Sequence, residues 1–102
     1  MTVQQFEVGG ITVTVCSFTS VRMRIVRPGV TIVVDLHHRR SWWERLRSAC
    51  DQPGVTPQID REWYVDWASD GLALTSDKLS LVAPVEVWST ICDHVIGAMK
   101  GS

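Results

Sequence analysis

The chain has 102 residues, a length that supports one hydrophobic core and excludes two domains of ordinary size. Its 45% hydrophobic and 21% charged content is typical of globular domains and excludes a disordered chain, and the net charge of −1 excludes a strongly basic protein. We therefore predict a single α+β domain over residues 1–100, followed by a flexible tail at 101–102.

The sequence also indicates a compartment. No apolar run approaches the ~20 residues that cross a bilayer, and the first ten residues lack the basic start and apolar core of a secretory signal. Cys16, Cys50 and Cys92 are an odd count without a CxxC pair, which argues against a disulfide framework and a structural zinc site. We predict a cytoplasmic protein without a cofactor or a membrane partner.

Charge is distributed unevenly along the chain. Residues 1–50 carry seven arginines against three acids, whereas residues 51–102 carry three basic residues against eight acids. This asymmetry predicts a basic face opposite an acidic one, which would favour recognition of a partner or head-to-tail self-association.

Residues 3–36 alternate apolar and polar side chains, which predicts four antiparallel strands. A two-residue Gly9-Gly10 turn sets Val8 opposite Ile11, and a Pro28-Gly29 turn sets Ile25 opposite Ile32. Between them we predict a three-residue loop, Phe18-Thr19-Ser20, which pairs Val15 with Met23. A two-residue loop would instead set Val15 against Arg24 and invert one face of the strand.

This register assigns every strand residue to a face. The second face meets water in the simplest interpretation, or packs against a second copy or a partner. Arg22 falls opposite Asp35 on it, which predicts a cross-strand ion pair. The predicted buried face consists of Phe6, Val8, Ile11, Val13, Val15, Val21, Met23, Ile25, Ile32, Val34 and Leu36. The predicted second face consists of Val3, Gln5, Glu7, Thr12, Thr14, Cys16, Arg22, Arg24, Val26, Thr31, Val33 and Asp35.

The stretch DLHHRRSWWE, residues 35–44, contains the main functional candidates. Ser41 and Glu44 have the spacing of a capping box, which predicts that a helix begins at Trp42 and ends near residues 52–54. The link before that helix is either a polar connector or an anion-binding patch beside a helix N-terminus, with an exposed tryptophan for stacking. The candidate binding patch comprises His37, His38, Arg39, Arg40, Trp42, Arg22 and Arg24.

Metal binding and catalysis are weaker hypotheses. Asp35, His37 and His94 could supply a facial triad, but adjacent histidines on an extended segment point apart, and no HxH or HxxxH spacing occurs. Cys50 and Cys92 fall on predicted helical stripes, which indicates inert buried thiols. We predict no metal site and no catalytic residue.

The second half begins with a Pro/Gly-containing loop at 51–61. Alternation around Trp63 and Trp67, followed by turns at 69–71 and 76–77, predicts a hairpin and a third strand. Pro84 suits the start of a helix that runs to about Met99, with His94 partly buried and hydrogen-bonded at its stripe edge. A domain this small cannot easily hide five tryptophans, so we expect at least one to be exposed or at a subunit interface.

The order ββββ-α-βββ-α predicts an α+β fold, a mostly antiparallel sheet with two helices packed on one face. The alternative is a seven-stranded barrel capped by the C-terminal helix. In element order alone, that alternative is similar to the pleckstrin-homology superfold, with Trp88 in the capping helix.

Three classes of function compete. The favoured hypothesis is a small non-catalytic module that binds, and in some settings inhibits or neutralises, a macromolecular protein partner, in the manner of phage or mobile-element accessory proteins, with a homo-oligomer as a further option. The second is anion or nucleic-acid binding through the arginines and Trp42, which predicts strongly salt-dependent affinity. The third is a small enzyme with His37 or His38 as general base.

Overall fold

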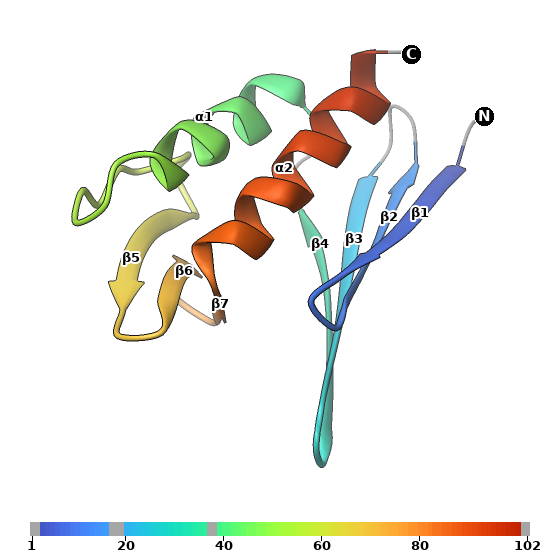
Figure 1. Cartoon of the computed structure of the whole chain (residues 1–102), viewed down its shortest axis with the longest axis horizontal. Helices are drawn as coiled ribbons and strands as arrows, with labels where there is room; N and C mark the ends of the chain where they lie inside the picture. Colours follow the sequence, from blue (N-terminus) through green and yellow to red (C-terminus); the bar gives the residue numbers. More distant parts are fainter. Residues whose placement is uncertain (1–2, 17–19, 37–38, 101–102) are drawn as a thin grey trace.

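The computed structural model describes residues 3–16, 20–36 and 39–100, which form two antiparallel sheets and two helices (Figure 1). The order ββββ-α-βββ-α confirms the predicted α+β class. The elements are β1 (Val3–Val8), β2 (Ile11–Cys16), β3 (Ser20–Arg27), β4 (Val30–Leu36), α1 (Arg40–Cys50), β5 (Tyr64–Ala68), β6 (Gly71–Thr75), β7 (Ser80–Ala83) and α2 (Val85–Lys100).

The first sheet has the order β1-β2-β3-β4, and two of its three predicted turns are confirmed. Val8 lies opposite Ile11, and Ile25 lies opposite Ile32. The middle turn is displaced from the prediction, because the ladder ends at Cys16 opposite Ser20. The loop therefore has the predicted three residues but begins one residue earlier, at 17, and those three residues lie outside the described part of the chain.

The displaced loop moves the β2–β3 register by two residues, so that Val15 lies opposite Val21 instead of Met23. Side chains alternate with period two along a strand, so a shift of two leaves each face unchanged. The predicted inner-face residues are accordingly all buried or packed against the core. The fully buried ones are Ile11, Val13, Val15, Val21, Met23, Ile25 and Leu36, and the partly buried ones are Phe6, Val8, Ile32 and Val34.

The remaining strands form a separate sheet with the order β5-β6-β7. The single sheet expected from the sequence is therefore divided in two, and the barrel alternative is wrong, since the seven described strands form no closed ring. Gly71 closes the β5–β6 turn with φ +156°, and a Cβ atom there would clash with the carbonyl oxygen of Ala83. Only glycine allows the turn to approach the end of β7 this closely.

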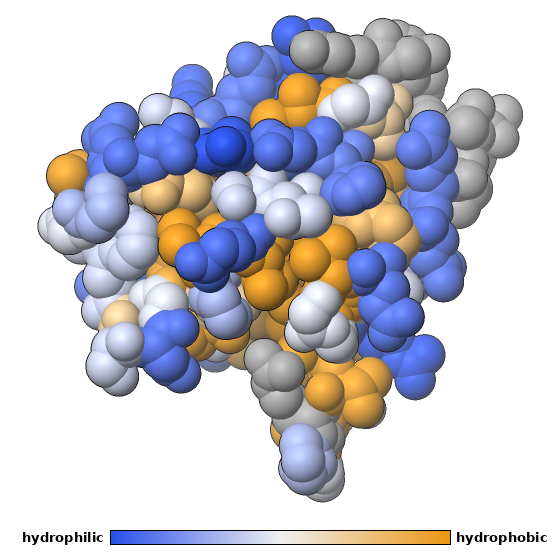
Figure 2. All heavy atoms as spheres, viewed as in Figure 1, coloured by the Kyte–Doolittle hydropathy of each residue, from blue (hydrophilic) through white to orange (hydrophobic). Residues whose placement is uncertain are grey.

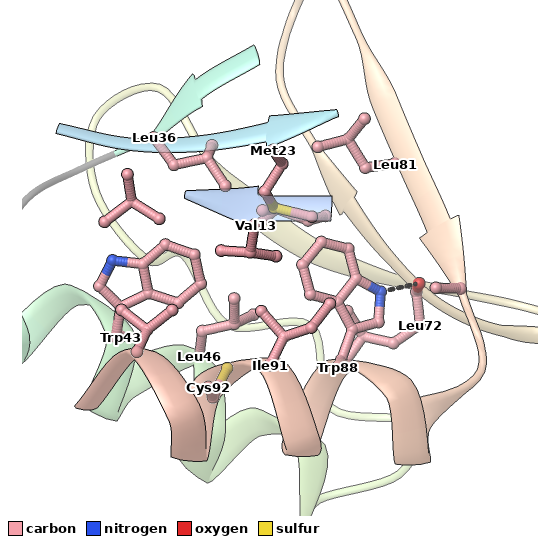
Figure 3. Packing of buried hydrophobic residues seen from close by; sticks show 14 of the residues in the cluster. Val13, Met23, Leu36, Trp43, Leu46, Leu72, Leu81, Trp88, Ile91 and Cys92 are labelled. Carbon is pink, nitrogen blue, oxygen red and sulfur yellow. Dashed lines mark hydrogen bonds between the residues drawn. The ribbon is translucent and has the colours of Figure 1, made fainter. Parts of the chain in front are cut away.

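Helix α2 occupies the centre of the molecule and contacts β1, β2, β6 and α1 (Figure 1). Four residues of its apolar stripe, Trp88, Ile91, Cys92 and Val95, are fully buried. The indole Nε1 of Trp88 donates a hydrogen bond of 3.0 Å to the carbonyl oxygen of Leu72, which ties α2 to β6 (Figure 3). Both sheets therefore share one core organised by α2. Neither described helix is long and apolar enough to span a membrane.

Helix α1 begins two residues earlier than predicted. Its first residue is Arg40, its N-cap is Arg39, and no side chain in the described part of the chain caps it. The prediction of a capping box was wrong. The Glu44 carboxylate instead accepts a hydrogen bond of 2.8 Å from Arg40 Nε, and Ser41 is exposed within the first turn of the helix. A charge-assisted pair at spacing i, i+4 competes with capping by the same carboxylate.

The tryptophans are more buried than expected. Trp42, Trp43, Trp63 and Trp88 are buried, and Trp67 is half-buried, so none meets the expectation of an exposed indole. Polar partners make this burial possible, because an indole N–H that is buried without an acceptor is costly. Besides Trp88, these partners are the Asp60 carboxylate for Trp42 and the Val55 carbonyl for Trp67, both at 2.7 Å.

Candidate functional site

The structure divides the patch predicted around residues 35–44. His37 and His38 lie outside the described residues. Arg39 and Arg40 are exposed at the start of α1, where Arg40 is paired with Glu44. Trp42 is only 2% exposed and its indole is hydrogen-bonded to Asp60, so its ring is not available to stack on a ligand.

Arg22 and Arg24 lie apart from the helix start, on the outer face of β3. Arg22 forms the predicted ion pair, with its Nε 2.8 Å from Asp35 Oδ1. The hydrogen bond from Arg22 holds the pKa of the Asp35 carboxyl below its ordinary value and raises the pKa of the arginine. Arg24 has no ion pair with an acid in residues 3–16, 20–36 and 39–100, so it is the cation on this face that is available to a partner.

A shallow hollow of about 580 Å³ covers this outer face. It extends over all four strands of the first sheet, and its walls combine hydroxyl, amide, guanidinium and apolar groups. The period-two alternation placed every one of its residues on the second face. The lining residues are Gln5, Thr12, Thr14, Arg22, Arg24, Val26, Thr31 and Val33.

Two valines expose apolar surface in the hollow. Val26 is 54% exposed and Val33 is 55% exposed, and they lie on adjacent strands, where Val33 faces Arg24 and Val26 faces Thr31. The β3–β4 hairpin that carries them projects beyond the rest of the molecule (Figure 1). Apolar residues also reach the surface on this hairpin, whereas hydrophilic residues cover the helices at the other end (Figure 2).

The charge asymmetry of the sequence is offset in part by ion pairs between its two halves. Arg47 of α1 binds Asp51 at 3.1 Å and Asp93 of α2 at 3.0 Å, joining the basic and acidic halves. Arg45 donates a hydrogen bond of 3.0 Å to the Ile59 carbonyl. These arginines therefore fasten the helices and the 51–63 loop together, and they do not form a separate basic face.

The remaining titratable candidates do not converge. Asp35 is on the outer face of the first sheet, whereas His94 stacks on Phe6, an inner-face residue, with ring centroids 4.6 Å apart. His94 is exposed, which corrects the expectation of a partly buried histidine. Within the described ranges no group of three or more His, Cys, Asp or Glu side chains is placed to hold a metal ion.

Cys50 and Cys92 are buried where α1 meets α2, as the helical stripes predicted. A hydrogen bond with Cys50, together with burial, raises the pKa of the Cys92 thiol far above its ordinary value. A thiol held protonated is a poor nucleophile, because the thiolate is the reactive form. Cys92 therefore contributes to packing and has no accessible chemistry.

The comparisons with known proteins give no further direction. No protein-family model, curated protein or solved structure matches the chain. The surface chemistry of the chain itself is therefore the source of any indication of function.

Proposed function

We propose that the protein is a small non-catalytic interaction module that binds a macromolecular protein partner through the outer face of the β1–β4 sheet. The observation that carries the proposal is the pair Val26 and Val33, both more than half exposed within a hollow of a well-formed sheet. An exposed apolar group surrounded by polar residues is a common feature of protein-binding surfaces.

The other side chains of the face indicate what the partner offers. Arg24 can donate hydrogen bonds to a carboxylate or a carbonyl group, and arginine is enriched in protein interfaces because its planar group forms several directed hydrogen bonds. Thr12, Thr14 and Thr31 can each donate and accept hydrogen bonds around the valines. We therefore expect a partner surface with an apolar centre and at least one acidic side chain. One form of this function is inhibition or neutralisation of that partner, as in phage or mobile-element accessory proteins.

Two observations favour a protein over nucleic acid. The outer face carries Arg22 and Arg24 against Glu7 and Asp35, so its charges balance and do not form the cationic surface that phosphate binding requires. The proposed stacking residue, Trp42, is buried. Nucleic-acid binding therefore receives less support than protein binding.

The composition of the hollow also favours a non-catalytic role. The described residues that line it include no histidine, cysteine or carboxylate, the groups that most often serve as general base or nucleophile. The enzyme alternative depends on His37 or His38, which lie outside the described residues.

The test is affinity capture of partners from the source organism by the wild-type chain and by two variants on the face, Val26→Lys and Arg24→Glu. Val55→Lys is the matched control, because Val55 is 48% exposed in the loop between α1 and β5, away from the hollow. We expect both face variants to lose a protein that the wild type and the control retain. Retention of the same protein by all variants would refute the face as the binding surface.

A further inference from the structure

The edges of the two sheets differ in how they are protected. The outer edge of β5 is covered by the preceding segment, because Val65 N donates to the Pro57 carbonyl at 2.9 Å and Gln58 bridges to Tyr64. Strand β7 has only four residues. Strand β1 carries the polar side chains Gln4, Gln5 and Glu7. Short, covered and polar edges resist unwanted pairing with another strand.

Strand β4 has none of these protections. It is an edge strand of seven residues, VTIVVDL, without lysine or proline, and its only charge belongs to Asp35, which is already paired with Arg22. No strand or bridge within residues 3–16, 20–36 and 39–100 pairs with its outer edge. Its core-facing residues Ile32 and Val34 are only partly buried, whereas Val13 and Met23 on the interior strands are fully buried.

The hairpin geometry fixes which backbone groups of β4 point outward. The turn has two residues, with Gly29 at φ +79°, and is flanked by Arg27 opposite Val30. In an antiparallel ladder, pairs that exchange both hydrogen bonds alternate with pairs that exchange none, and the pair closing a two-residue turn is of the first kind. Thr31, Val33 and Asp35 therefore direct their N–H and C=O groups away from β3, toward the free edge.

We propose that β4 pairs antiparallel with β4 of a second copy of this chain, giving a symmetric dimer with one continuous sheet and Val33 on the two-fold axis. In this register Val33 faces Val33, and Thr31 of each copy faces Asp35 of the other. Thr31, Val33 and Asp35 of one copy then each lie opposite one of these three residues in the other copy. Each facing pair exchanges two backbone hydrogen bonds. Sliding the strands by two residues loses one of the three pairs, and sliding by one residue turns apolar side chains to the wrong face.

The side chains of β4 are self-complementary in the same register. On the inner face Ile32 meets Val34 of the second copy, so the partly buried edge of the core is continued. On the outer face Val33 covers Val33, and the Asp35 carboxylate meets the Thr31 hydroxyl. No like charges face each other, because the two Asp35 residues lie at opposite ends of the paired strands. The pairing covers Val33 and Thr31 at the β4 margin of the hollow and leaves its residues on β1, β2 and β3 uncovered, so dimer formation and partner binding can be tested separately.

Sedimentation equilibrium of the whole chain, at concentrations up to about 1 mM, tests the dimer. We expect the mean mass to rise with concentration from 11.4 kDa toward twice that value. In Val33→Lys, two lysines meet at the axis, and we expect the dimer dissociation constant to increase about tenfold or more. Val26→Lys is the matched control: its valine is equally exposed on the same face but on interior strand β3, and we expect a change within about twofold.

A wild-type chain that remains at 11.4 kDa throughout this range would overturn the proposal. So would a dimer that is lost in Val26→Lys and kept in Val33→Lys, because the interface would then be the outer face. The two proposals fail separately, since loss of partner capture in Val26→Lys concerns the hollow and loss of the dimer in Val33→Lys concerns the edge.

Cysteine crosslinking tests the register. Facing residues in a hydrogen-bonded antiparallel pair have Cα atoms about 5.5 Å apart, within the range that a disulfide spans. With Cys16→Ser as background, Val33→Cys should form a covalent dimer when oxidised glutathione accepts the two electrons and is reduced to two thiols. Thr31→Cys alone should not, because Thr31 faces Asp35. Crosslinking by Thr31→Cys in place of Val33→Cys would refute the register.

Discussion

The two sheets are both antiparallel, but they differ in how much of their faces and edges the rest of the molecule covers. In the β5–β7 sheet, Leu72, Ala73 and Leu74 are consecutive and all buried, so both faces of the central strand are covered. In the β1–β4 sheet, the central strands bury one face only, and Val26 and Val33 remain exposed on the other. The exposed face and the longest edge strand that is unpaired among the described residues, β4, both belong to the first sheet.

This difference distinguishes residues that pack within the molecule from residues whose exposed side chains are available for binding. In the second sheet the indoles, the turn glycine and the 57–60 segment all serve packing. In the first sheet, the outer residues contribute little to the core, and we propose that they contact another molecule. Substitutions in the second sheet should therefore affect stability, whereas substitutions on the open face should affect binding.

The largest expected effect is at Gly71. Gly71→Ala places a Cβ atom against the Ala83 backbone, and we expect a loss of about 4 kcal/mol in the free energy of unfolding, measured by chemical denaturation. Gly10→Ala is the control, because Gly10 also has positive φ, +80°, but open space around it. For Gly10→Ala we expect the free energy of unfolding to fall by only about 1 kcal/mol, which is the cost of backbone strain alone. Equal effects at the two glycines would contradict the close packing of the β5–β6 turn.

The next effect concerns the link between α2 and the second sheet. Trp88→Phe removes the donor to the Leu72 carbonyl and leaves a void. We expect this substitution to lower the free energy of unfolding by about 3 kcal/mol. Trp67→Phe removes a similar hydrogen bond to the Val55 carbonyl, but at a half-buried position where water can replace the donor. We therefore expect the free energy of unfolding to fall by only about 1 kcal/mol. Thermal and urea denaturation of both variants measure the difference, and a smaller loss at Trp88 than at Trp67 would be inconsistent with this packing.

A third test addresses the segment that covers β5. Asp60 accepts hydrogen bonds from Trp42 Nε1 at 2.7 Å and from the amides of Glu62 and Trp63 at 2.7 and 2.8 Å. Asp60→Ala should lower the free energy of unfolding by about 2 kcal/mol, because the Trp42 donor is left without its carboxylate. In the exposed control Asp77→Ala we expect a change within about 0.5 kcal/mol. If Asp60→Ala were equally neutral, the segment would not be held by this carboxylate.

The smallest effect is expected on the open face. Because Arg22 lowers the pKa of Asp35 in the folded state, the pair contributes its stabilisation fully above the unfolded pKa of about 3.9 and loses it as pH falls through the folded value. Carboxyl carbon NMR should show the Asp35 pKa rising toward its ordinary value in Arg22→Gln, with a minor change in stability, since the pair is exposed. An unchanged titration would contradict the ion pair.

The strand register was predictable because it is a local property. The Gly9-Gly10 and Pro28-Gly29 turns each fix one pairing, and the need to bury one face excludes odd shifts. The middle loop was misplaced because two registers that differ by two residues bury the same face, and no residue at 17–20 selects between them. The helix start was missed because Arg40 and Ser41 compete for Glu44, and only geometry decides which is bound.

The division into two sheets and the burial of the tryptophans were not predictable, because both depend on contacts distant in sequence. Nothing near Trp88 indicates that the Leu72 carbonyl would accept its N–H, and nothing near Trp42 indicates Asp60. The candidate site was predictable in part. Alternation placed all eight lining residues of the hollow on one face, whereas the patch around residues 35–44 assumed a convergence of loop, helix and strand that the described residues do not show.

The most direct test of the open face as the binding surface compares Val26→Lys with Val55→Lys in affinity capture from the source organism, after both are shown to unfold at the wild-type denaturant concentration. We predict that a protein captured by the wild type and by Val55→Lys is lost in Val26→Lys. Capture of that protein by both variants alike, or no specific capture by the wild type, would contradict the central claim that this half-exposed sheet face binds a partner.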